Sequence, residues 1–393
     1  MIMEEIRIGI IGIGNMGFAH ASCIYGGGVK GMRLCALCDT DGEKLERART
    51  EFYGVRLFDR YERLFESGIT DAVIIAVPHR LHAEIAAAAF KSGLHVMTEK
   101  PADISVLAAR RMNAAAAESK KAFGIMFNQR TNPLYCKARE LVRGGRLGEL
   151  KRSVWIITNW YRTQGYYDSG GWRATWSGEG GGVLINQAPH NLDLWQWICG
   201  MPSSVTAFCD TAKYHNIEVE DDVTIFARYP DGATGTFITS TGEYPGTNRL
   251  EISGTRGKLV IENGVLKLWE NSIDEREICY NNEINPSAVT VNYSEFVPKE
   301  PETAHRGVLQ SFADCILKGS PLVAEGSQGI NSLEISNAAY LSEWTGNKEI
   351  ALPLDAEEFD AFLRRKAASS SFTESGGSGE ADGEYKKRWQ VRW

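Results

Sequence analysis

The chain has 393 residues, more than one ordinary hydrophobic core accommodates, so we expect two domains. Its formal net charge of -7 argues against nucleic acid or an anionic membrane as the main partner, because both favour a basic surface. No apolar run approaches the roughly 20 residues that span a bilayer, and no basic segment precedes the first hydrophobic residues. We therefore expect a cytoplasmic protein that binds a small molecule and contacts neither nucleic acid nor membrane.

In residues 1–127, short apolar runs alternate with helical patterns such as those at 41–54 and 81–93. Apolar runs without polar alternation are typical of parallel strands covered on both faces. The alternation of strand and helix predicts a doubly wound α/β domain of the Rossmann type. The predicted strands are Ile6–Ile11, Met32–Cys38, Ala72–Val77, His95–Thr98 and Ala122–Met126.

After residue 130 the pattern changes to that of an α+β domain, which we assign to residues 128–355. A helix is expected at 133–145, and the turns "YPDGAT" (229–234) and "ENGV" (262–265) indicate β-hairpins. The region predicts one large, open and mostly antiparallel sheet, with later helices at 305–319 and 329–346. The predicted strands are at about 151–160, 204–213, 222–229, 233–241, 248–253, 258–262 and 265–269.

Residues 356–393 are expected to form a C-terminal helix followed by a flexible tail. The stretch "SSSFTESGGSGEADGE" is too polar to bury the apolar surface that ordering requires. The eight cysteines have no repeated spacing, so no disulfide framework is predicted. Cys35 and Cys38 form a C-x-x-C, but a strand places them on opposite faces, which favours a structural role over a metal site.

A glycine motif, Gly12-x-Gly14-x-x-Gly17, directly follows the first predicted strand and opens a helix. The glycines allow a tight turn and close approach to a pyrophosphate, while the helix N-terminus supplies N–H donors. The second strand ends in Asp39, whose carboxylate can bind the two ribose hydroxyls of NAD and repel the 2′-phosphate of NADP. Thr40 and Asp41 supply no cation. The motif therefore predicts NAD, with NADP less favoured.

Further polar residues follow predicted strands at the edge where open α/β sheets bind ligands. Glu99 and Lys100 come directly after the strand "HVMT". A lysine there is either a solvated loop residue or an ammonium directed at a ligand. Asn128 follows the next strand, where a substrate contact and hydrogen bonding within a domain linker both remain open.

The segments "GIGNMG", "EKP" and "GGWRATWSGEGGGVLINQAPHNLD", in this order and spacing, resemble the Gfo/Idh/MocA family of nicotinamide-dependent sugar and cyclitol dehydrogenases. The resemblance extends to about residue 355. It implies a Rossmann domain followed by a domain whose open sheet often forms an oligomer interface, so we expect a homodimer or homotetramer. The implied reaction is the oxidation of a ring hydroxyl or the reduction of the corresponding ketone.

The resemblance also implies individual roles. Lys100 and His190 match the catalytic lysine and histidine. Asn186 stands where the family usually has Asp, four residues before the histidine; because an amide can only orient a partner by hydrogen bonds, we expect it to position the substrate. The residues implied to bind the cofactor are Gly12, Gly14, Asn15, Met16, Asp39, Pro78, His82, Glu99, Lys100, Trp172 and Arg173.

His190 follows Pro189, a residue favoured at the first position of a helix. The positive end of the helix dipole favours a neutral imidazole there, which can accept a proton. We expect His190 to act as the general base and Lys100 to stabilise the developing alkoxide. The alternative is a helix-start histidine bonded to Asp193. The glycines at 180–182 are expected to let the backbone approach the ligand closely.

Six of the ten tryptophans lie between residues 155 and 197, and aromatic rings pack well against the C–H face of a sugar. We expect the tryptophans at 160–176 to line the site and Trp195 and Trp197 to lie in the core. Since no Lys/Arg cluster accompanies the motifs, an unphosphorylated sugar, glycoside or cyclitol is favoured. The predicted substrate-binding residues are Lys100, Asn128, Tyr161, Tyr166, Trp172, Asn186 and His190.

The sequence thus favours an NAD-dependent dehydrogenase acting on CH–OH groups. Two alternatives are a glycoside hydrolase or lyase that uses NAD for transient oxidation and a nucleotide-binding regulator without activity. Net NADH production separates the first two, and inertness toward a broad panel of polyols would favour the third.

Overall fold

The computed structural model describes residues 5–370, so the tail predicted at 371–393 lies outside the described residues. Contacts between Cα atoms divide the chain into two compact units. Of the described residues, 5–131 and Thr303–Leu333 form the first unit, and Asn132–Glu302 and 334–370 form the second.

These units differ from the predicted division at 127/128 and 355/356 because the chain returns to the first unit after residue 302. The helix α10 (Ala304–Lys318) explains the return. Its apolar face places Val308 and Phe312 in the same hydrophobic cluster as Ile8 of the first sheet. The amphipathic pattern of this helix was visible in the sequence, but its partner was not.

The sheet of the first unit has six parallel strands in the order β3-β2-β1-β4-β5-β6. The strand order reverses between β1 and β4, which creates the switch point where such sheets bind ligands. The doubly wound fold is therefore confirmed. The three-residue strand β3 was not predicted, because its residues are half-buried or exposed. The strands are β1 (Ile6–Ile11), β2 (Met32–Cys38), β3 (Arg56–Phe58), β4 (Ala72–Ile75), β5 (His95–Thr98) and β6 (Phe123–Ile125).

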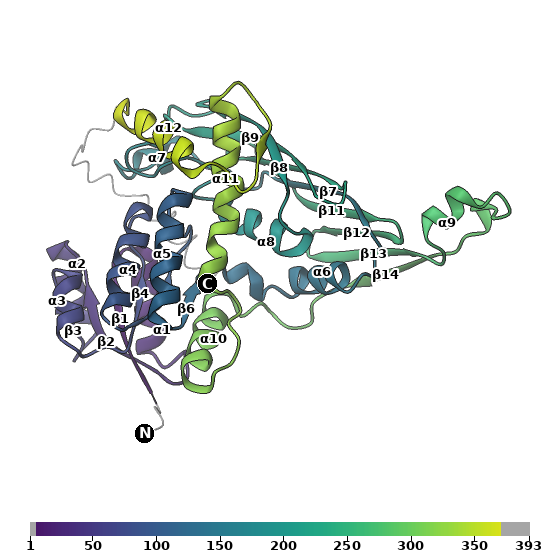
Figure 1. The fold of residues 1–393 in the computed structure, drawn as a ribbon. Coiled ribbons are helices and arrows are strands. Elements are labelled where there is room, and N and C mark those ends of the chain that lie inside the picture. Colours follow the sequence, from purple (N-terminus) through teal and green to yellow (C-terminus); the bar gives the residue numbers. More distant parts are fainter. Residues whose placement is uncertain (1–4, 371–393) are drawn as a thin grey trace. The chain divides into compact units, whose positions relative to one another are not determined.

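Helices cover both faces of this sheet, which explains why the strands are apolar without alternation. Residues of α1, α2 and α10 share one cluster with Ile6, Ile8 and Ile10, while Leu64 of α3 approaches the opposite face at Gly9. Figure 1 shows α4 and α5 lying side by side along the sheet. The helices are α1 (Asn15–Tyr25), α2 (Gly42–Glu51), α3 (Tyr61–Glu66), α4 (His82–Lys91) and α5 (Val106–Ser119), with short turns η1 (His79–Leu81), η2 (Asn128–Thr131) and η4 (Gly326–Gln328).

The second unit contains a nine-stranded sheet in the order β14-β13-β12-β11-β7-β10-β9-β8-β15. All neighbouring strands are antiparallel except the pair β7 and β10, which confirms the large, mostly antiparallel sheet. The strands are β7 (Leu150–Ile157), β8 (Ser204–Thr211), β9 (Glu220–Arg228), β10 (Thr234–Ser240), β11 (Asn248–Gly254), β12 (Gly257–Glu262), β13 (Val265–Asn271), β14 (Val291–Phe296) and β15 (Ile350–Ala351).

Two of these strands, β14 and β15, were not predicted. The side chains of β14 are almost all exposed, so it lacks the alternation that marks a half-buried strand. At the "ENGV" hairpin, positive φ values at Asn263 (51°) and Gly264 (78°) give the turn expected from the sequence. Beyond the ends of β13 and β14, the chain forms α9 (Glu275–Tyr280) and the turn η3 (Pro286–Ala288), and α9 projects past the sheet (Figure 1).

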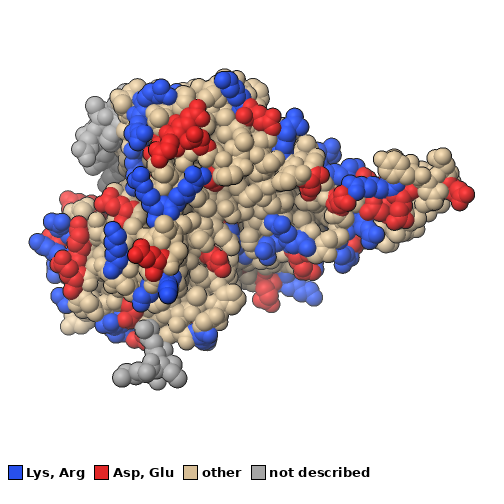
Figure 2. Space-filling view, viewed as in Figure 1, with Lys and Arg blue, Asp and Glu red and all other residues tan. Residues whose placement is uncertain are grey.

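The remaining helices are α6 (Pro133–Arg143), α7 (Gln164–Asp168), α8 (Pro189–Cys199), α11 (Gly329–Trp344) and α12 (Ala356–Ala368). Acidic and basic side chains are interspersed on the face drawn in Figure 2. Within residues 5–370, no helix is long and apolar enough to cross a membrane. All eight cysteines are free thiols; Cys38 is buried and Cys35 half-buried.

Candidate active site

The glycine turn between β1 and α1 has the geometry of an anion site. Gly12 has φ +84°, and a Cβ there would lie 2.4 Å from the carbonyl oxygen of Ala76. A Cβ on Gly14 would meet nothing within 4 Å, so the space beside this residue is open. The first turn of α1, which begins with Asn15 and Met16, has neither an acidic residue nor a side-chain cap. Its N–H groups therefore fit a pyrophosphate.

Asp39 lies at the end of β2 beside this turn. Its Oδ2 accepts the backbone N–H of Ile13 at 2.8 Å, and its Oδ1 accepts that of Asp41 at 3.0 Å. The carboxylate is thus held where a ribose can approach. The ammonium of Lys44 lies 3.6 Å from Oδ1, a half-exposed cation that our reading of Thr40 and Asp41 missed. Its helical spacing from Asp41, the N-cap of α2, could have revealed it.

Glu99, after β5, is a buried carboxylate bonded to His20 of α1. The distance from Nε2 of His20 to Oε1 of Glu99 is 2.8 Å. Burial by itself raises the pKa of Glu99, but the hydrogen bond and charge of His20, with the nearby charge of Lys100, outweigh burial and hold this pKa at about 2. Lys100 also donates its backbone N–H to Oε2 at 3.2 Å. The lowered pKa favours an ionised carboxylate directly before the half-buried Lys100.

His305 of α10 joins the same cluster, and the sequence motifs gave no indication of it. Its ring centroid lies 5.8 Å from that of His20, and its Nδ1 lies 3.4 Å from Nδ2 of Asn128. Burial lowers the pKa of His305 to about 3, so this imidazole is neutral. Asn128, predicted to bind substrate, is itself buried and contacts His305 in this structure.

His82 differs from the prediction that it lines the nicotinamide side. Its ring is fully buried, with Nδ1 2.7 Å from the carbonyl oxygen of Pro101 and Nε2 2.8 Å from that of Val77. Burial lowers the pKa of His82. The ring thus links the loops that follow β4 and β5, and this geometry corrects the expected ligand contact. Pro78, in the first of these loops, is exposed.

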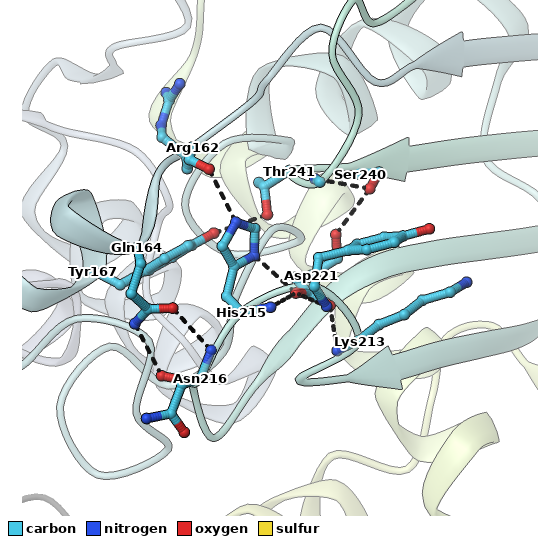
Figure 3. Close-up of polar contacts among 11 residues, drawn as sticks. Arg162, Gln164, Tyr167, Lys213, His215, Asn216, Asp221, Ser240 and Thr241 are labelled. Carbon is cyan, nitrogen blue, oxygen red and sulfur yellow. Dashed lines mark hydrogen bonds and ion pairs between the residues drawn. The ribbon is translucent and has the colours of Figure 1, made fainter.

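In the second unit, the candidate residues lie in the β7–α8 loop (residues 158–188), which a buried His–Asp pair attaches to the sheet (Figure 3). Nδ1 of His215 lies 2.9 Å from Oδ2 of Asp221, and Nε2 lies 2.9 Å from the carbonyl oxygen of Arg162 in the loop. The ring also contacts Tyr167, whose hydroxyl lies 2.8 Å from Oγ1 of Thr241. A neutral imidazole could donate to only one of the two oxygens.

Asp221 is fully buried and accepts the backbone N–H groups of Lys213 at 2.9 Å, Tyr214 at 2.8 Å and His215 at 3.0 Å. One carboxylate therefore shapes the turn that carries His215. Neither residue belonged to a motif, so the sequence gave no reason to select them.

The glycine run before α8 is required by protein packing. A Cβ on Gly182 would lie 2.0 Å from the carbonyl oxygen of Glu220, and one on Gly181 would lie 2.3 Å from the hydroxyl of Tyr340. The carboxylate of Glu220 accepts the N–H groups of Gly182 and Leu184, each at 2.9 Å, and the hydroxyl of Tyr340 at 2.7 Å. Burial raises the pKa of Glu220 to about 7. Packing against protein atoms thus requires glycine at 181 and 182, and the expected approach of this backbone to a ligand stays a prediction.

Tyr166 is the centre of a polar cluster in the β7–α8 loop. Its hydroxyl oxygen accepts from Nη1 of Arg173 at 2.8 Å, Nδ2 of Asn186 at 3.2 Å and Nε2 of Gln187 at 3.4 Å. The guanidinium of Arg173 lies 4.7 Å from the ring centroids of both Tyr166 and Trp172. Four predicted residues are thus brought together. Asn186 also donates to Glu179, a buried carboxylate whose role no sequence motif indicated.

His190 is half-buried in the first turn of α8, directly after Pro189, as predicted. Asp193, the alternative partner, is fully buried and accepts from Nε2 of Gln196 at 3.0 Å. Trp160 donates to Oδ1 of Asn191 at 3.3 Å, which connects the loop to the same turn. Tyr161 is exposed, and its ring centroid lies 5.5 Å from that of Tyr244.

The division of the tryptophans between the core and the candidate site differs in part from the prediction. Trp195 is fully buried, as expected, and Trp197 is half-buried under the guanidinium of Arg139. Trp176 was expected to line the site, but it is buried with its edge against Tyr340 and Trp344. Its role is therefore in the core. Trp160 and Trp172 remain the half-buried aromatic candidates of the loop.

Two models of one protein family match this chain. The oxidoreductase family with an NAD-binding Rossmann fold matches residues 6–127, and the GFO/IDH/MocA C-terminal domain matches residues 135–260. The two matches together cover more than half of the chain. The chain belongs to the Gfo/Idh/MocA family.

Two curated relatives extend the match along the chain. Inositol 2-dehydrogenase from Rhizobium meliloti (strain 1021) is 24% identical over 350 residues, which cover 86% of this chain and 96% of that protein. Myo-inositol 2-dehydrogenase from Thermotoga maritima is 24% identical over 346 residues, with 86% and 96% covered.

Solved structures agree in fold. The WlbA dehydrogenase from Bordetella pertussis, in complex with NADH and UDP-GlcNAcA, has a TM-score of 0.74 and 27% identity, covering 89% of this chain and 100% of that chain. Levoglucosan dehydrogenase, in complex with NADH and levoglucosan, has a TM-score of 0.72 and 20% identity, with 89% and 100% covered. This Gfo/Idh/MocA chain is an NAD-dependent oxidoreductase of the sugar dehydrogenase type, acting on CH–OH groups of a small molecule.

Proposed function

We propose that this enzyme transfers a hydride between a ring carbon of an unphosphorylated sugar, glycoside or cyclitol and the nicotinamide. The observation that carries the proposal is a pair of groups at the motif positions of the family. Lys100 lies beside the buried, charged Glu99, and His190 lies in the first turn of α8. An ammonium stabilised by a carboxylate and a histidine at a helix start suit the removal of a hydroxyl proton.

Bound NAD supplies the hydride acceptor for this oxidation. The open space at Gly14 and the uncapped first turn of α1 fit the pyrophosphate, with Asn15 and Met16 offering backbone N–H groups. Asp39 would bind the hydroxyls of the adenosine ribose. Trp172 and Arg173 remain proposed cofactor contacts, as does Pro78.

The proton chemistry is divided between the two candidate catalytic residues. His190 would accept the hydroxyl proton, and Lys100 would stabilise the negative charge that develops on the oxygen. The nearby charge of Lys100 helps to lower the pKa of Glu99, because an opposite charge stabilises the ionised carboxylate. General base catalysis by His190 would be worth roughly 10²–10⁴ in rate.

The substrate would be recognised by hydroxyl-binding and aromatic residues. The cluster of Tyr166, Arg173 and Asn186 offers an amide and a phenol beside the half-buried ring of Trp172. Tyr161 and Asn128 remain proposed contacts. The names of the relatives, which include inositol and levoglucosan dehydrogenases, support a ring polyol.

We also propose that copies of the chain associate through the sheet of the second unit. Phe208 of β8 and Phe226 of β9 are exposed by 56% and 37%, and they stand on neighbouring strands. Burying such rings between two sheets would be favourable. Separately, we propose that the enzyme is located in the cytoplasm.

The test is substitution of the two catalytic candidates. Lys100→Ala and His190→Ala should each lower turnover of the preferred polyol by at least ~10² while NAD affinity persists. Lys91→Ala, on the exposed end of α4, is the matched control and should leave turnover unchanged. Wild-type turnover in His190→Ala would show that another group accepts the proton.

A further inference from the structure

The carboxylate of Glu179 is buried in the β7–α8 loop, with an exposed fraction of 2%. Its Oε2 accepts the backbone N–H of Ala174 at 2.7 Å, and its Oε1 accepts from Nδ2 of Asn186. A carboxylate only accepts hydrogen bonds, so the nitrogen of the Asn186 amide must face it. Glu179 therefore fixes which way the amide points.

The second N–H of this amide is directed to Tyr166. The distance from Nδ2 of Asn186 to the hydroxyl oxygen of Tyr166 is 3.2 Å, and Arg173 donates to the same oxygen at 2.8 Å. A chain of contacts thus runs from the carboxylate of Glu179 through an amide and a phenol to a guanidinium. Because the amide is planar, these two partners of its nitrogen also fix the orientation of its carbonyl oxygen.

Glu179 also holds the turn that carries Arg173. Ala174 has φ +52°, in the left-handed region that disfavours residues with a Cβ. Its N–H is the group bonded to Glu179, and its carbonyl oxygen accepts the N–H of Glu218 at 3.2 Å. A strained residue persists only where its surroundings hold it. One carboxylate thus orients Asn186 and stabilises the turn beside it.

We propose that Glu179 is a positioning residue that acts through Asn186, and that the pair makes the site select a hydroxyl. The carbonyl oxygen of Asn186, held by Glu179, would accept a hydrogen bond from the substrate. A hydroxyl satisfies this acceptor, whereas a carboxylate or phosphate at the same place would be repelled. This inference rests on the proposed function. It places the carboxylate of Glu179 in contact with residue 186, the position where the family usually has Asp.

The contact with Glu179 predicts the effect of the substitution Asn186→Asp, which introduces the residue that is commoner in the family. The introduced carboxylate would contact Glu179, and two adjacent carboxylates cannot both ionise without cost. N186D should therefore be impaired, increasingly as the pH rises. The exchange E179Q/N186D should relieve the conflict, because the introduced amide can then donate to the introduced carboxylate.

The experiment compares wild type, E179Q, N186D and E179Q/N186D with E251Q as a matched control on strand β11. Thermal midpoints and kcat/KM for a preferred polyol are measured from about pH 5 to about pH 9, together with NAD affinity. We expect E179Q to lose roughly 10- to 100-fold in kcat/KM, because a donor facing the Asn186 amide turns it over. NAD affinity and E251Q should follow wild type.

In the same series, the midpoint of N186D should fall relative to wild type as the pH rises, and that of E179Q/N186D should not. An E179Q enzyme with unchanged kcat/KM and pH profile would overturn the positioning role. A midpoint of N186D that follows wild type at every pH would overturn the contact between the two groups. Absence of turnover in wild type itself would instead refute the proposed function, since the midpoints are read without any substrate.

Discussion

The two units hold their functional groups in different ways. In the first, Asp39, Glu99 and Asn128 follow the regular strands β2, β5 and β6, whose hydrogen bonds fix where each strand ends. In the second, the β7–α8 loop has no strand, and three buried carboxylates, Glu179, Glu220 and Asp221, accept its backbone N–H groups or those of the turn attached to it. In the sheet, repeated hydrogen bonds between strands position the functional groups, whereas in this loop single carboxylates hold the backbone in place.

The difference predicts that one substitution is costlier in the second unit than in the first. Asp221→Ala leaves three part-buried backbone N–H groups and the ring of His215 without their acceptor, so we expect a loss of about 3–5 kcal/mol in the free energy of unfolding. Asp39→Ala removes the acceptor of two N–H groups at a part-buried turn and should cost about 1 kcal/mol. Urea denaturation of both variants measures this, and equal losses would contradict the comparison.

Glu220 makes the second unit sensitive to pH. Burial raises its pKa from the ordinary 4.5 to about 7, so the folded chain binds an extra proton between these values. Its contribution to stability is therefore present below about pH 4.5 and is lost as the pH rises through about 7, by up to about 3 kcal/mol. Glu220→Gln should flatten this part of the curve of unfolding free energy against pH.

Asp103 is a buried carboxyl group of the first unit that should also make stability depend on pH. Burial raises its pKa to about 7 as well, so Asp103→Asn should remove a second part of the same slope. A slope that is unchanged in both single variants and in E220Q/D103N would show that neither carboxyl is protonated in the folded chain near neutral pH.

Substitutions at two glycines should distinguish an effect on stability from an effect on NAD binding. Gly182→Ala forces a Cβ to within 2.0 Å of the carbonyl oxygen of Glu220 and should cost about 1–3 kcal/mol of stability. Gly14→Ala meets open space, so the thermal midpoint should stay within about 2 °C of wild type. NAD affinity should nevertheless fall at least tenfold, because the methyl group occupies the place of the pyrophosphate. Isothermal titration with NAD and thermal scans of both variants provide the test.

Regular structure was predictable because it repeats. All seven predicted strands of the second sheet exist, and the turn at Asn263 and Gly264 forms as its residues require. The segment around α10 was predicted as a helix, but its packing against β1 was not predicted. An amphipathic pattern indicates that one helix face is buried, but it does not identify the element that buries it.

The candidate site was predictable only where a motif specified it. Trp172, Arg173 and Asn186 were selected from the motif and Tyr166 as an aromatic residue of the loop, and the structure brings them together. His20 and His305 join Glu99 through contacts distant in sequence, which no motif indicated. His82 shows the opposite error. A histidine after a strand suggested a ligand contact, yet its two ring nitrogens lie against backbone carbonyl oxygens, and nothing local in the sequence distinguishes these outcomes.

The central claim is most directly tested by NADH formation. The purified chain is mixed with NAD and a panel of inositols, monosaccharides and glycosides, and NADH absorbance is followed in wild type and His190→Ala. We expect at least one unphosphorylated ring polyol to produce NADH in proportion to the substrate consumed, and the variant to be at least ~10² slower. Consumption of a glycoside without accumulation of NADH, or inertness toward the whole panel despite NAD binding, would contradict it.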